Sequence, residues 1–203
     1  MPQEIVKKCR AGFTMTEMSI VLALIGVVLS TVWAVAAKVS EQQKSNDAYN
    51  QLGIIVENIL TLKHSQGKSF SSTSWNVITD DMIKADAIPQ TFLSKTTSTK
   101  ANSPWKPDGF IVSEKYDGAA QKGAFRIVFE DPTPAGCVAL ILRATSCEAG
   151  QMACPYKVHT KNGSQSKDPD ATKGWATMTT KQAADLCDEN TESSSSVGFD
   201  YYL

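Results

Sequence analysis

The segment Arg10–Met18, RAGFTMTEM, together with the run that follows it, SIVLALIGVVLSTVWAVAA (19–37), decides how this chain folds. No charged side chain occurs in the 20 residues from Met18 to Ala37. A helix of that length spans roughly 30 Å, the thickness of a bilayer core. The sequence therefore predicts a membrane-crossing helix, with Glu17 placed where a carboxylate would be drawn toward lipid.

The charges that flank the apolar run predict its orientation. Three basic residues precede the run against one acid, whereas the flank after it is mixed in charge. The positive-inside rule then keeps the N-terminus in the cytoplasm and places the chain after Lys38 across the membrane. The basic residues are Lys7, Lys8 and Arg10, and the acid is Glu4.

The helix is expected to continue beyond the apolar run. Residues 38–48 are polar but contain no proline or glycine, so nothing there stops a helix. Apolar residues then recur at spacings of three and four, which predicts a helix that buries one face. We expect one helix of about 50 residues, from Phe13 to near Lys63, ended by Gly67. The apolar positions of its second half are Tyr49, Leu52, Ile55, Val56, Ile59 and Leu60.

The rest of the chain contains short patterned segments, typical of an antiparallel sheet with small helices. Residues 124–130 alternate, with aromatic and aliphatic side chains on one face and Arg126 and Glu130 on the other. Residues 136–143 are nearly all apolar, so we expect a central strand covered on both faces. Further strands are predicted at residues 75–78, 109–113 and 197–203.

Capping signals predict two short helices. Residues 79–81, Thr-Asp-Asp, are expected to cap a helix over residues 79–87, which Pro89 stops. Thr179 and Gln182 have the spacing of a capping box, which predicts a helix within residues 180–190. A polar loop is predicted at residues 161–173.

The cysteines indicate disulfides rather than a metal site. Cys9 would stay on the cytoplasmic side, while four others would enter an oxidising compartment, where an even count predicts two disulfides. Four cysteines allow three pairings. No C-x-x-C is present, and His64 and His159 are far from the cysteines in sequence, which disfavours zinc. The four are Cys137, Cys147, Cys154 and Cys187.

The opening motif resembles that of a known family. Gly12-Phe13-Thr14-Met15-Thr16-Glu17, followed by an apolar run that contains Gly26, is similar to the class III signal of type IV prepilins. Type IV pilins and the pseudopilins of type II secretion share that signal. The resemblance covers some 25 residues and implies an α+β type IV pilin fold. In that fold a long N-terminal α-helix of about 50 residues packs on a C-terminal antiparallel β-sheet head with short helices and disulfides.

The resemblance also implies roles for three residues and a division of the chain. A prepilin peptidase would cut between Gly12 and Phe13 and N-methylate Phe13, and Glu17 would pair with the Phe13 amine of a neighbouring subunit as an assembly charge. The expected division is a leader peptide, 1–12; an N-terminal helix, 13–66, with a transmembrane or filament-core part, 13–37, and an amphipathic part packed on the head, 38–66; and a periplasmic or extracellular αβ head with a disulfide-bonded C-terminal region, 67–203.

Pilins of this kind usually close a C-terminal loop with a disulfide, and Cys187 resembles the second half of that bridge. We favour Cys154–Cys187 with Cys137–Cys147. Cys137–Cys187 with Cys147–Cys154 is the next alternative.

The implied function is that of a structural subunit, not an enzyme, of a type IVb-like pilus used in adhesion, aggregation, conjugation or a similar role. The subtype follows from the mature length, although Phe13 at the first mature position is usual in type IVa. The implied partners are further copies in a helical homopolymer, the prepilin peptidase, an inner-membrane assembly platform with its ATPase, an outer-membrane secretin, and membrane lipid before assembly. The chain would lie in the inner membrane as a single-pass protein and then in an extracellular pilus.

Two other functions stay open. The first is a type II secretion pseudopilin or a minor pilin. The second is a secreted soluble disulfide-bonded domain that signal peptidase releases near Ala36, after an A-x-A site. The intact mass of the mature chain separates the secreted domain from the pilin-type proteins, whose mature chain would begin at Phe13.

No cofactor, metal or nucleic-acid partner is predicted. Acidic residues of the C-terminal region could supply calcium ligands, but acids in loops are usually solvated. Removal of the leader, with three basic residues and one acid, would change the formal net charge from -1 to -3, which disfavours nucleic acid. The acidic residues considered are Asp168, Asp170, Asp185, Asp188 and Glu189.

Overall fold

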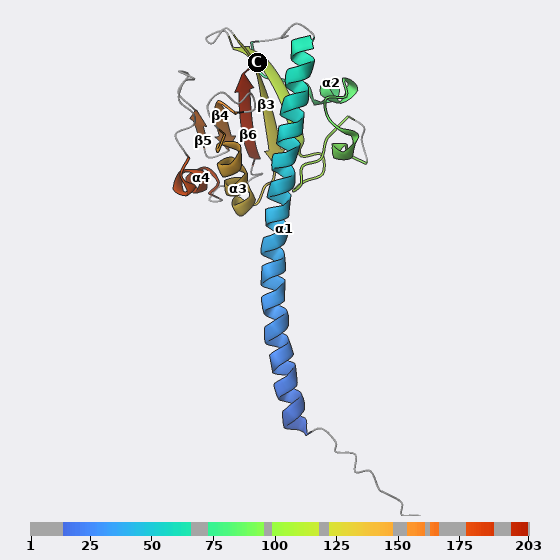
Figure 1. Cartoon of the computed structure of the whole chain (residues 1–203), viewed down its shortest axis with the longest axis vertical. Coiled ribbons are helices and arrows are strands. Elements are labelled where there is room, and N and C mark those ends of the chain that lie inside the picture. The colour runs from blue at the N-terminus through green and yellow to red at the C-terminus, as the bar shows by residue number, and fades with distance from the viewer. Residues whose placement is uncertain are drawn as a thin grey trace, which may run out of the picture. The chain divides into compact units, whose positions relative to one another are not determined.

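The computed structural model describes residues 14–65, 73–95, 99–117, 122–147, 154–160, 163–166, 178–188 and 196–202. The chain divides into two compact units, residues 1–40 and 41–203 (Figure 1). The predicted cleavage site, Gly12–Phe13, and the predicted helix end at Gly67 lie outside the described residues.

Helix α1, Met15–Ser65, is the long helix that the sequence predicted. Its residues up to Ser40 lie in the first unit, and those from Glu41 onward in the second. In the second unit most of the apolar stripe is buried as expected, with Leu52, Ile55 and Ile59 almost completely covered, but Tyr49 at its start is 40% exposed. The helical spacing of apolar residues therefore located both the element and its buried face.

The second unit contains a six-stranded antiparallel sheet with strand order β1-β2-β3-β6-β4-β5. The residues of α1 from Glu41 onward cover one face of this sheet (Figure 1). The strands are β1, Asn76–Val77; β2, Phe110–Asp117; β3, Lys122–Glu130; β4, Lys157–Thr160; β5, Gly163–Ser166; and β6, Ser196–Tyr202.

Alternation along β3 sets the two faces of the sheet. Phe125 and Ile127 are buried on the face that packs against α1, and Phe125 stacks on Tyr201 of β6 with ring centroids 5.1 Å apart. Arg126 lies on the opposite face, because successive residues of a strand point to opposite sides. The prediction for residues 124–130 is confirmed.

Residues 136–143 are helical, so the prediction of a central strand there was wrong. They belong to α3, Pro134–Ala144, in which Thr133 is the N-cap and its Oγ1 accepts from the Gly136 N–H at 3.1 Å. Proline at the first position suits a helix start. The buried residues follow helical spacing rather than alternation, and they are Gly136, Cys137, Leu140, Ile141 and Ala144.

The other short helices are α2, Thr79–Lys84; η1, Gln90–Phe92; and α4, Thr180–Leu186. The capping box of Thr179 and Gln182 is confirmed. Thr79 does not cap α2, because its Oγ1 accepts from the Val112 N–H of β2 at 2.9 Å.

The predicted polar loop, residues 161–173, was wrong for residues 163–166, which form β5. That strand pairs with β4, and neither strand has the apolar alternation from which sequence analysis recognises a strand.

The two disulfides are Cys137–Cys187 and Cys147–Cys154, so the favoured pairing was wrong and the alternative pairing is observed. Helix α3 keeps Cys137 away from Cys147. From Cys137 to the helix end at Ala144 the backbone rises roughly 10 Å, whereas disulfide Cα atoms lie within about 7 Å. Helix α4 packs on α3 and brings Cys187 to Cys137, with their Cα atoms 6.0 Å apart.

Candidate functional site

The described part of the N-terminal motif begins with a reciprocal capping box. The Thr14 N–H and Oγ1 both donate to Glu17 Oε2 at 3.0 Å, and the Glu17 N–H donates to Thr14 Oγ1 at 3.3 Å. Helix starts leave N–H groups without intrahelical partners, and this arrangement satisfies two of them. The Glu17 carboxylate therefore helps to start α1 through contacts within its own chain.

Sequence analysis missed this local role of Glu17. The signal was present, because Thr14 and Glu17 have the T-x-x-E spacing of a capping box ahead of an apolar run.

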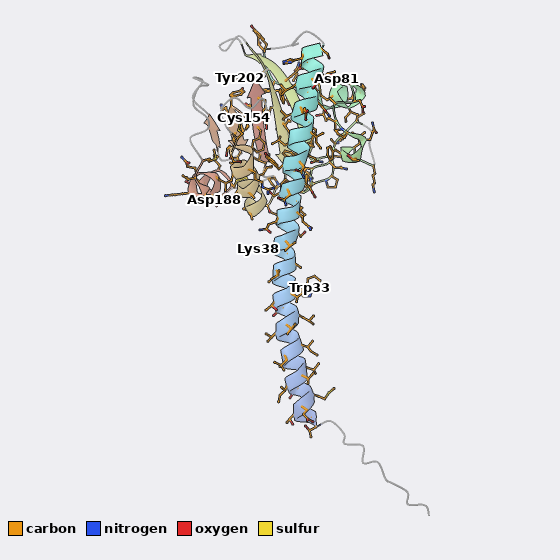
Figure 2. The ribbon with its side chains drawn as sticks, viewed as in Figure 1. Trp33, Lys38, Asp81, Cys154, Asp188 and Tyr202 are labelled. Atoms are coloured by element: carbon orange, nitrogen blue, oxygen red, sulfur yellow. A yellow bond between two sulfur atoms is a disulfide. The ribbon has the colours of Figure 1, made fainter. Side chains whose placement is uncertain are left out.

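The stem, defined as residues Met15–Ser40 of α1, is apolar on all sides. Its large apolar side chains are between 45% and 92% exposed, and the Trp33 indole is among the most exposed (Figure 2). The hydroxyls of Ser19, Ser30 and Thr31 donate to carbonyls of their own helix, each at 2.8 Å. By length and composition, α1 is the one helix among the described residues that could cross a membrane. An apolar surface of this extent requires lipid or protein to cover it.

In the second unit, the Glu41 carboxylate joins α1 to two other segments. Its Oε2 accepts from Thr133 Oγ1 at 2.7 Å and from Trp105 Nε1 at 3.3 Å, and its Oε1 accepts from Lys44 at 3.1 Å. Thr133 is the N-cap of α3. The hydrogen bond from Thr133 is the main cause that lowers the pKa of Glu41 below its usual value.

We expect Glu41 to make the stability of the second unit dependent on pH. Because the pKa of Glu41 is lowered in the folded state, its contribution is present above the unfolded pKa of roughly 4.3 and is lost as the pH falls through the folded value. Glu41→Gln should lower the unfolding free energy by about 0.5–1 kcal/mol at pH 7 and by progressively less under acid conditions. Denaturant unfolding of the full chain in detergent, between pH 7 and pH 3, measures the difference. Glu57→Gln, at an exposed glutamate of the same helix, is the matched control, and an equal effect of both variants would contradict the role of Glu41.

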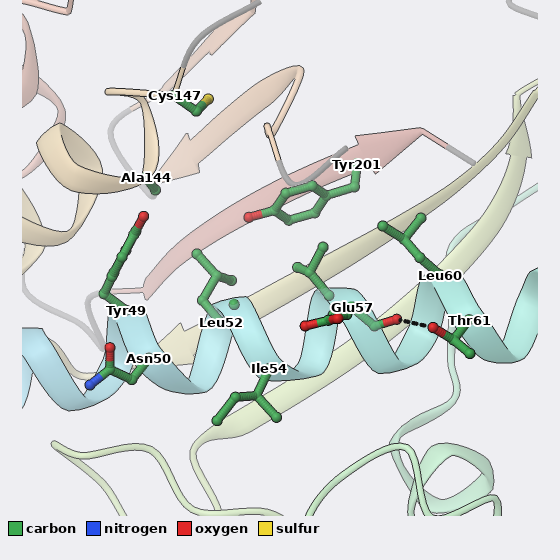
Figure 3. Close-up of a pocket in the computed structure, with 12 residues that line it drawn as sticks. Tyr49, Asn50, Leu52, Ile54, Glu57, Leu60, Thr61, Ala144, Cys147 and Tyr201 are labelled. Carbon is green, nitrogen blue, oxygen red and sulfur yellow. Dashed lines mark hydrogen bonds between the residues drawn. The ribbon is translucent and has the colours of Figure 1, made fainter. Parts of the chain in front are cut away.

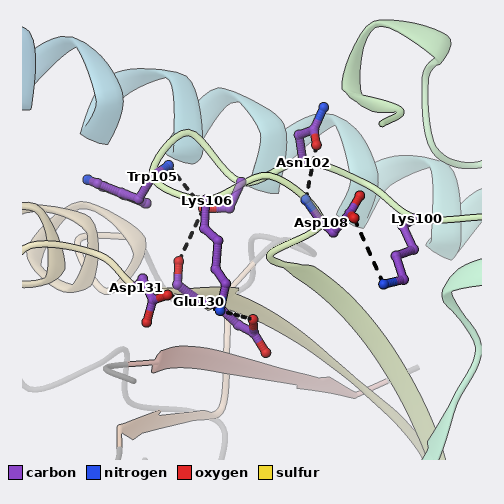
Figure 4. Close-up of polar contacts among 8 residues, drawn as sticks. Lys100, Asn102, Trp105, Lys106, Asp108, Glu130 and Asp131 are labelled. Carbon is purple, nitrogen blue, oxygen red and sulfur yellow. Dashed lines mark hydrogen bonds and ion pairs between the residues drawn. The ribbon is translucent and has the colours of Figure 1, made fainter. Parts of the chain in front are cut away.

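A second polar cluster fixes the loop before β2 (Figure 4). Lys106 Nζ lies 3.0 Å from both Glu130 Oε2 and Asp131 Oδ2, and these carboxylates raise the pKa of Lys106. Asn102 Oδ1 accepts from the Asp108 N–H at 3.1 Å. These contacts hold the loop against the end of β3, and they are structural.

Near the end of α1, Lys63 and Glu114 form a buried ion pair. Lys63 Nζ lies 2.5 Å from Glu114 Oε2, and each side chain is 8% exposed. Removal of one partner of such a pair would leave a buried charge, so the contact fixes the position of α1 on β2.

Neither the acidic residues nor the histidines form a metal site in the part of the chain that the structure describes. No group of three or more His, Cys, Asp or Glu side chains there could hold a metal ion. Asp185 and Asp188 are described and exposed, whereas Asp168, Asp170 and Glu189 lie outside the described residues. His159 instead contacts Asp200, its Nε2 lying 2.7 Å from Asp200 Oδ2.

A groove of about 960 Å³ lies beside α1 in the second unit (Figure 3). Apolar side chains, including Leu52, Ile54 and Leu60, make up much of its lining, and Glu57 is the single carboxylate among the lining residues. Burial raises the pKa of the lining residue Tyr201 well above its usual value, so the phenol stays neutral. The lining includes no histidine, lysine or arginine, and so offers no acid–base pair.

The long helix, the antiparallel sheet and the two disulfides together form the α+β fold of a type IV pilin, as expected. A model of the prokaryotic N-terminal methylation motif matches residues 7–33. The chain therefore carries a type IV prepilin-like signal, the substrate of a prepilin peptidase, and this signal indicates a structural protein of the type IV pilin-like or pseudopilin class. Comparison with curated proteins finds no match.

Proposed function

We propose that this chain is the structural subunit of a type IVb-like pilus. A prepilin peptidase removes residues 1–12 by cutting between Gly12 and Phe13, and Phe13 becomes the N-methylated first residue. The mature chains then polymerise into a helical surface filament. The observation that supports this most directly is the exposed, uncharged run from Met18 to Ala37, which overlaps the methylation motif at residues 7–33.

The stem gives the physical reason for polymerisation. Full burial of one Val, Leu or Ile side chain is worth about 1.5–3 kcal/mol, and the stem exposes many of them. Lipid covers this surface while the subunit is in the membrane. Outside the membrane, the stems of further copies provide the apolar cover.

Glu17 sets the axial register of docking in this proposal. Its carboxylate pairs with the Phe13 amine of a neighbouring copy, and any other register leaves a charge unpaired among apolar side chains. Before docking, the capping contacts with Thr14 satisfy the Glu17 carboxylate within its own chain. On docking, the Glu17 carboxylate therefore exchanges Thr14 of its own chain for the Phe13 amine of a neighbouring copy.

The location and partners follow from the same proposal. The N-terminus lies in the cytoplasm and the head, residues 67–203, beyond the inner membrane. An inner-membrane platform with its ATPase adds subunits, and the filament leaves through an outer-membrane secretin. The filament serves adhesion, aggregation, conjugation or a similar role.

Intact mass and electron microscopy of sheared cells test the proposal together. We expect the mature chain to begin at Phe13, to be heavier by one methyl group, and to be the main protein of sheared filaments. A chain processed at Phe13 but absent from such filaments would instead indicate a pseudopilin or a minor pilin. A mature chain that begins after Ala36 would indicate a secreted soluble domain.

A further inference from the structure

We propose that the sheet face opposite α1 binds a carboxylated polysaccharide. The site is the cationic patch, defined as Lys115, Arg126, Lys157 and His159, on strands β2, β3 and β4. It lies within the second unit and does not depend on how the stem assembles.

Strand register gathers these residues on one side of the sheet. Arg126 of β3 pairs in register with Asp200 of β6, and Asp200 pairs in turn with Lys157 of β4. Residues directly opposite each other in an antiparallel pair project to the same face. Phe125 and Val158, their sequence neighbours, are buried on the other face. Three strands distant in sequence therefore contribute to one surface.

Arg126 is held in a fixed orientation. Its Nε donates to Asp200 Oδ1 at 2.6 Å and its Nη2 donates to Oδ2 at 3.0 Å. Its Cζ also lies 4.1 Å from the centre of the Trp75 ring. The Asp200 side chain is 2% exposed. Burial alone would raise the pKa of Asp200, but the hydrogen bonds from His159 and Arg126 outweigh burial and lower it, so the carboxylate stays ionised.

This orientation leaves the Nη1 group of the guanidinium for a ligand, because Nη2 also lies 2.8 Å from His159 Nε2. Among the residues that the structure describes, no acceptor bonds Arg126 Nη1, and the Arg126 side chain is 24% exposed. A guanidinium already fixed by an acid and an aromatic ring loses little side-chain entropy when it binds a carboxylate. Lys115 Nζ lies 5.0 Å from the centre of the same Trp75 ring, which places a second cation beside that ring.

The charge of the patch favours an anionic ligand. Beside Arg126 on this face the register places two permanent cations, Lys115 and Lys157, and one carboxylate, Asp200. Farther along, Asp117 and Lys122 lie opposite each other and their formal charges cancel. Glu130, at the far end of β3, is paired with Lys106. The whole chain nevertheless carries a net charge of -1. A small cationic patch on an anionic protein suits single carboxylates better than duplex nucleic acid, which carries one charge per about 1.7 Å.

Aromatic side chains beside the patch favour a sugar as the bearer of that carboxylate. Tyr202 lies on the same face as Asp200, two residues away on β6, and stacks on Tyr156 with ring centroids 3.7 Å apart. The Tyr156 N–H donates to the Asp200 carbonyl, which ties this pair to the patch. Aromatic rings offer flat apolar surface to the C–H faces of sugar rings. A uronic acid polymer has both the ring and the charge.

Binding of immobilised oligogalacturonate to the full chain in detergent tests the site. We expect the double variant Lys115→Gln/Lys157→Gln to bind about tenfold more weakly than wild type, the loss expected when charge-assisted contacts are removed. Lys84→Gln/Lys100→Gln removes the same charge from exposed lysines outside the patch, and it should bind within about twofold of wild type. Thermal unfolding of all chains verifies that each is folded.

Four outcomes would overturn the proposal. The first is no binding by wild type. The second is equal weakening by the two double variants, which indicates non-specific attraction. The third is equal binding of methyl-esterified oligogalacturonate, whose carboxylates are blocked, and the fourth is tighter binding of duplex DNA. None of these outcomes changes the expected mature mass or the expected filaments.

Discussion

Chains with Glu17→Ala should be cut and inserted into the membrane as wild-type chains are, but should form at least about a hundredfold fewer filaments. The reason is the Phe13 amine, which in the proposed filament has Glu17 of a neighbour as its partner. Without that carboxylate, each docked subunit would bury an unpaired positive charge among apolar stems. A buried charge left alone in this way costs about 3–5 kcal/mol. A cost of that size lowers the equilibrium constant for docking by more than about a hundredfold.

Two further variants separate this role from capping. Glu17→Gln keeps a side-chain oxygen for Thr14 but removes the charge, and should assemble as poorly as Glu17→Ala. Thr14→Val removes the Oγ1 contacts but keeps the charge, and should assemble much closer to wild type. Electron microscopy of sheared cells measures the filaments, and intact mass measures processing. Normal filaments from Glu17→Gln, with few from Thr14→Val, would leave Glu17 as a helix cap alone.

The long helix could be predicted because its signals are local and repeated many times. The stem has no polar face, and the stripe through Leu52, Ile55 and Ile59 repeats over several turns. Strand β3 was predictable for a similar reason, because its alternation extends over most of the strand. Both signals come from the period at which side chains return to one face.

Helix α3 could not be distinguished from a strand by apolar content. The run CVALILR (137–143) is almost entirely apolar, and such a short run fits a buried helix as well as a buried strand. The start signals, Thr133 and Pro134, were the better guide. The pairing of the disulfides is a separate error. An extended segment, at about 3.3 Å per residue, would separate Cys137 from Cys147 even further than the helix does, so neither state of this segment favours the pairing Cys137–Cys147.

The candidate site was predictable to different degrees. Gly12 and Phe13 were assigned from a contiguous motif, and their roles stay predictions because they lie outside the described residues. The contact of Arg126 with His159 and Asp200 depends on the register of three strands. No spacing in the sequence indicates that register, and β4 itself was not predicted. Sequence analysis could therefore not find the cationic patch.

The pairing of the disulfides leads to the second large effect. The double variant Cys137→Ala/Cys187→Ala should lower the unfolding free energy by about 4 kcal/mol, and Cys147→Ala/Cys154→Ala by about 2 kcal/mol. The difference follows from the length of chain that each bridge closes, because the sequence separations are 50 and 7 residues. A longer closed loop removes more conformational entropy from the unfolded chain.

Denaturant unfolding of the full chain in detergent, followed by a signal from the sheet, measures both effects. Cys9→Ala is the control, because Cys9 lies before the proposed cleavage site and belongs to neither of the two disulfides. Cys137 and Cys187 are buried between α3 and α4, so their replacement also loosens the packing of those helices. The loss of unfolding free energy should therefore be at least the value of about 4 kcal/mol expected from chain closure. If the two double variants were equally unstable, chain closure would not be the main contribution. If Cys147→Ala/Cys154→Ala were the weaker protein, the assignment of Cys137–Cys187 as the principal covalent link of the head would be wrong.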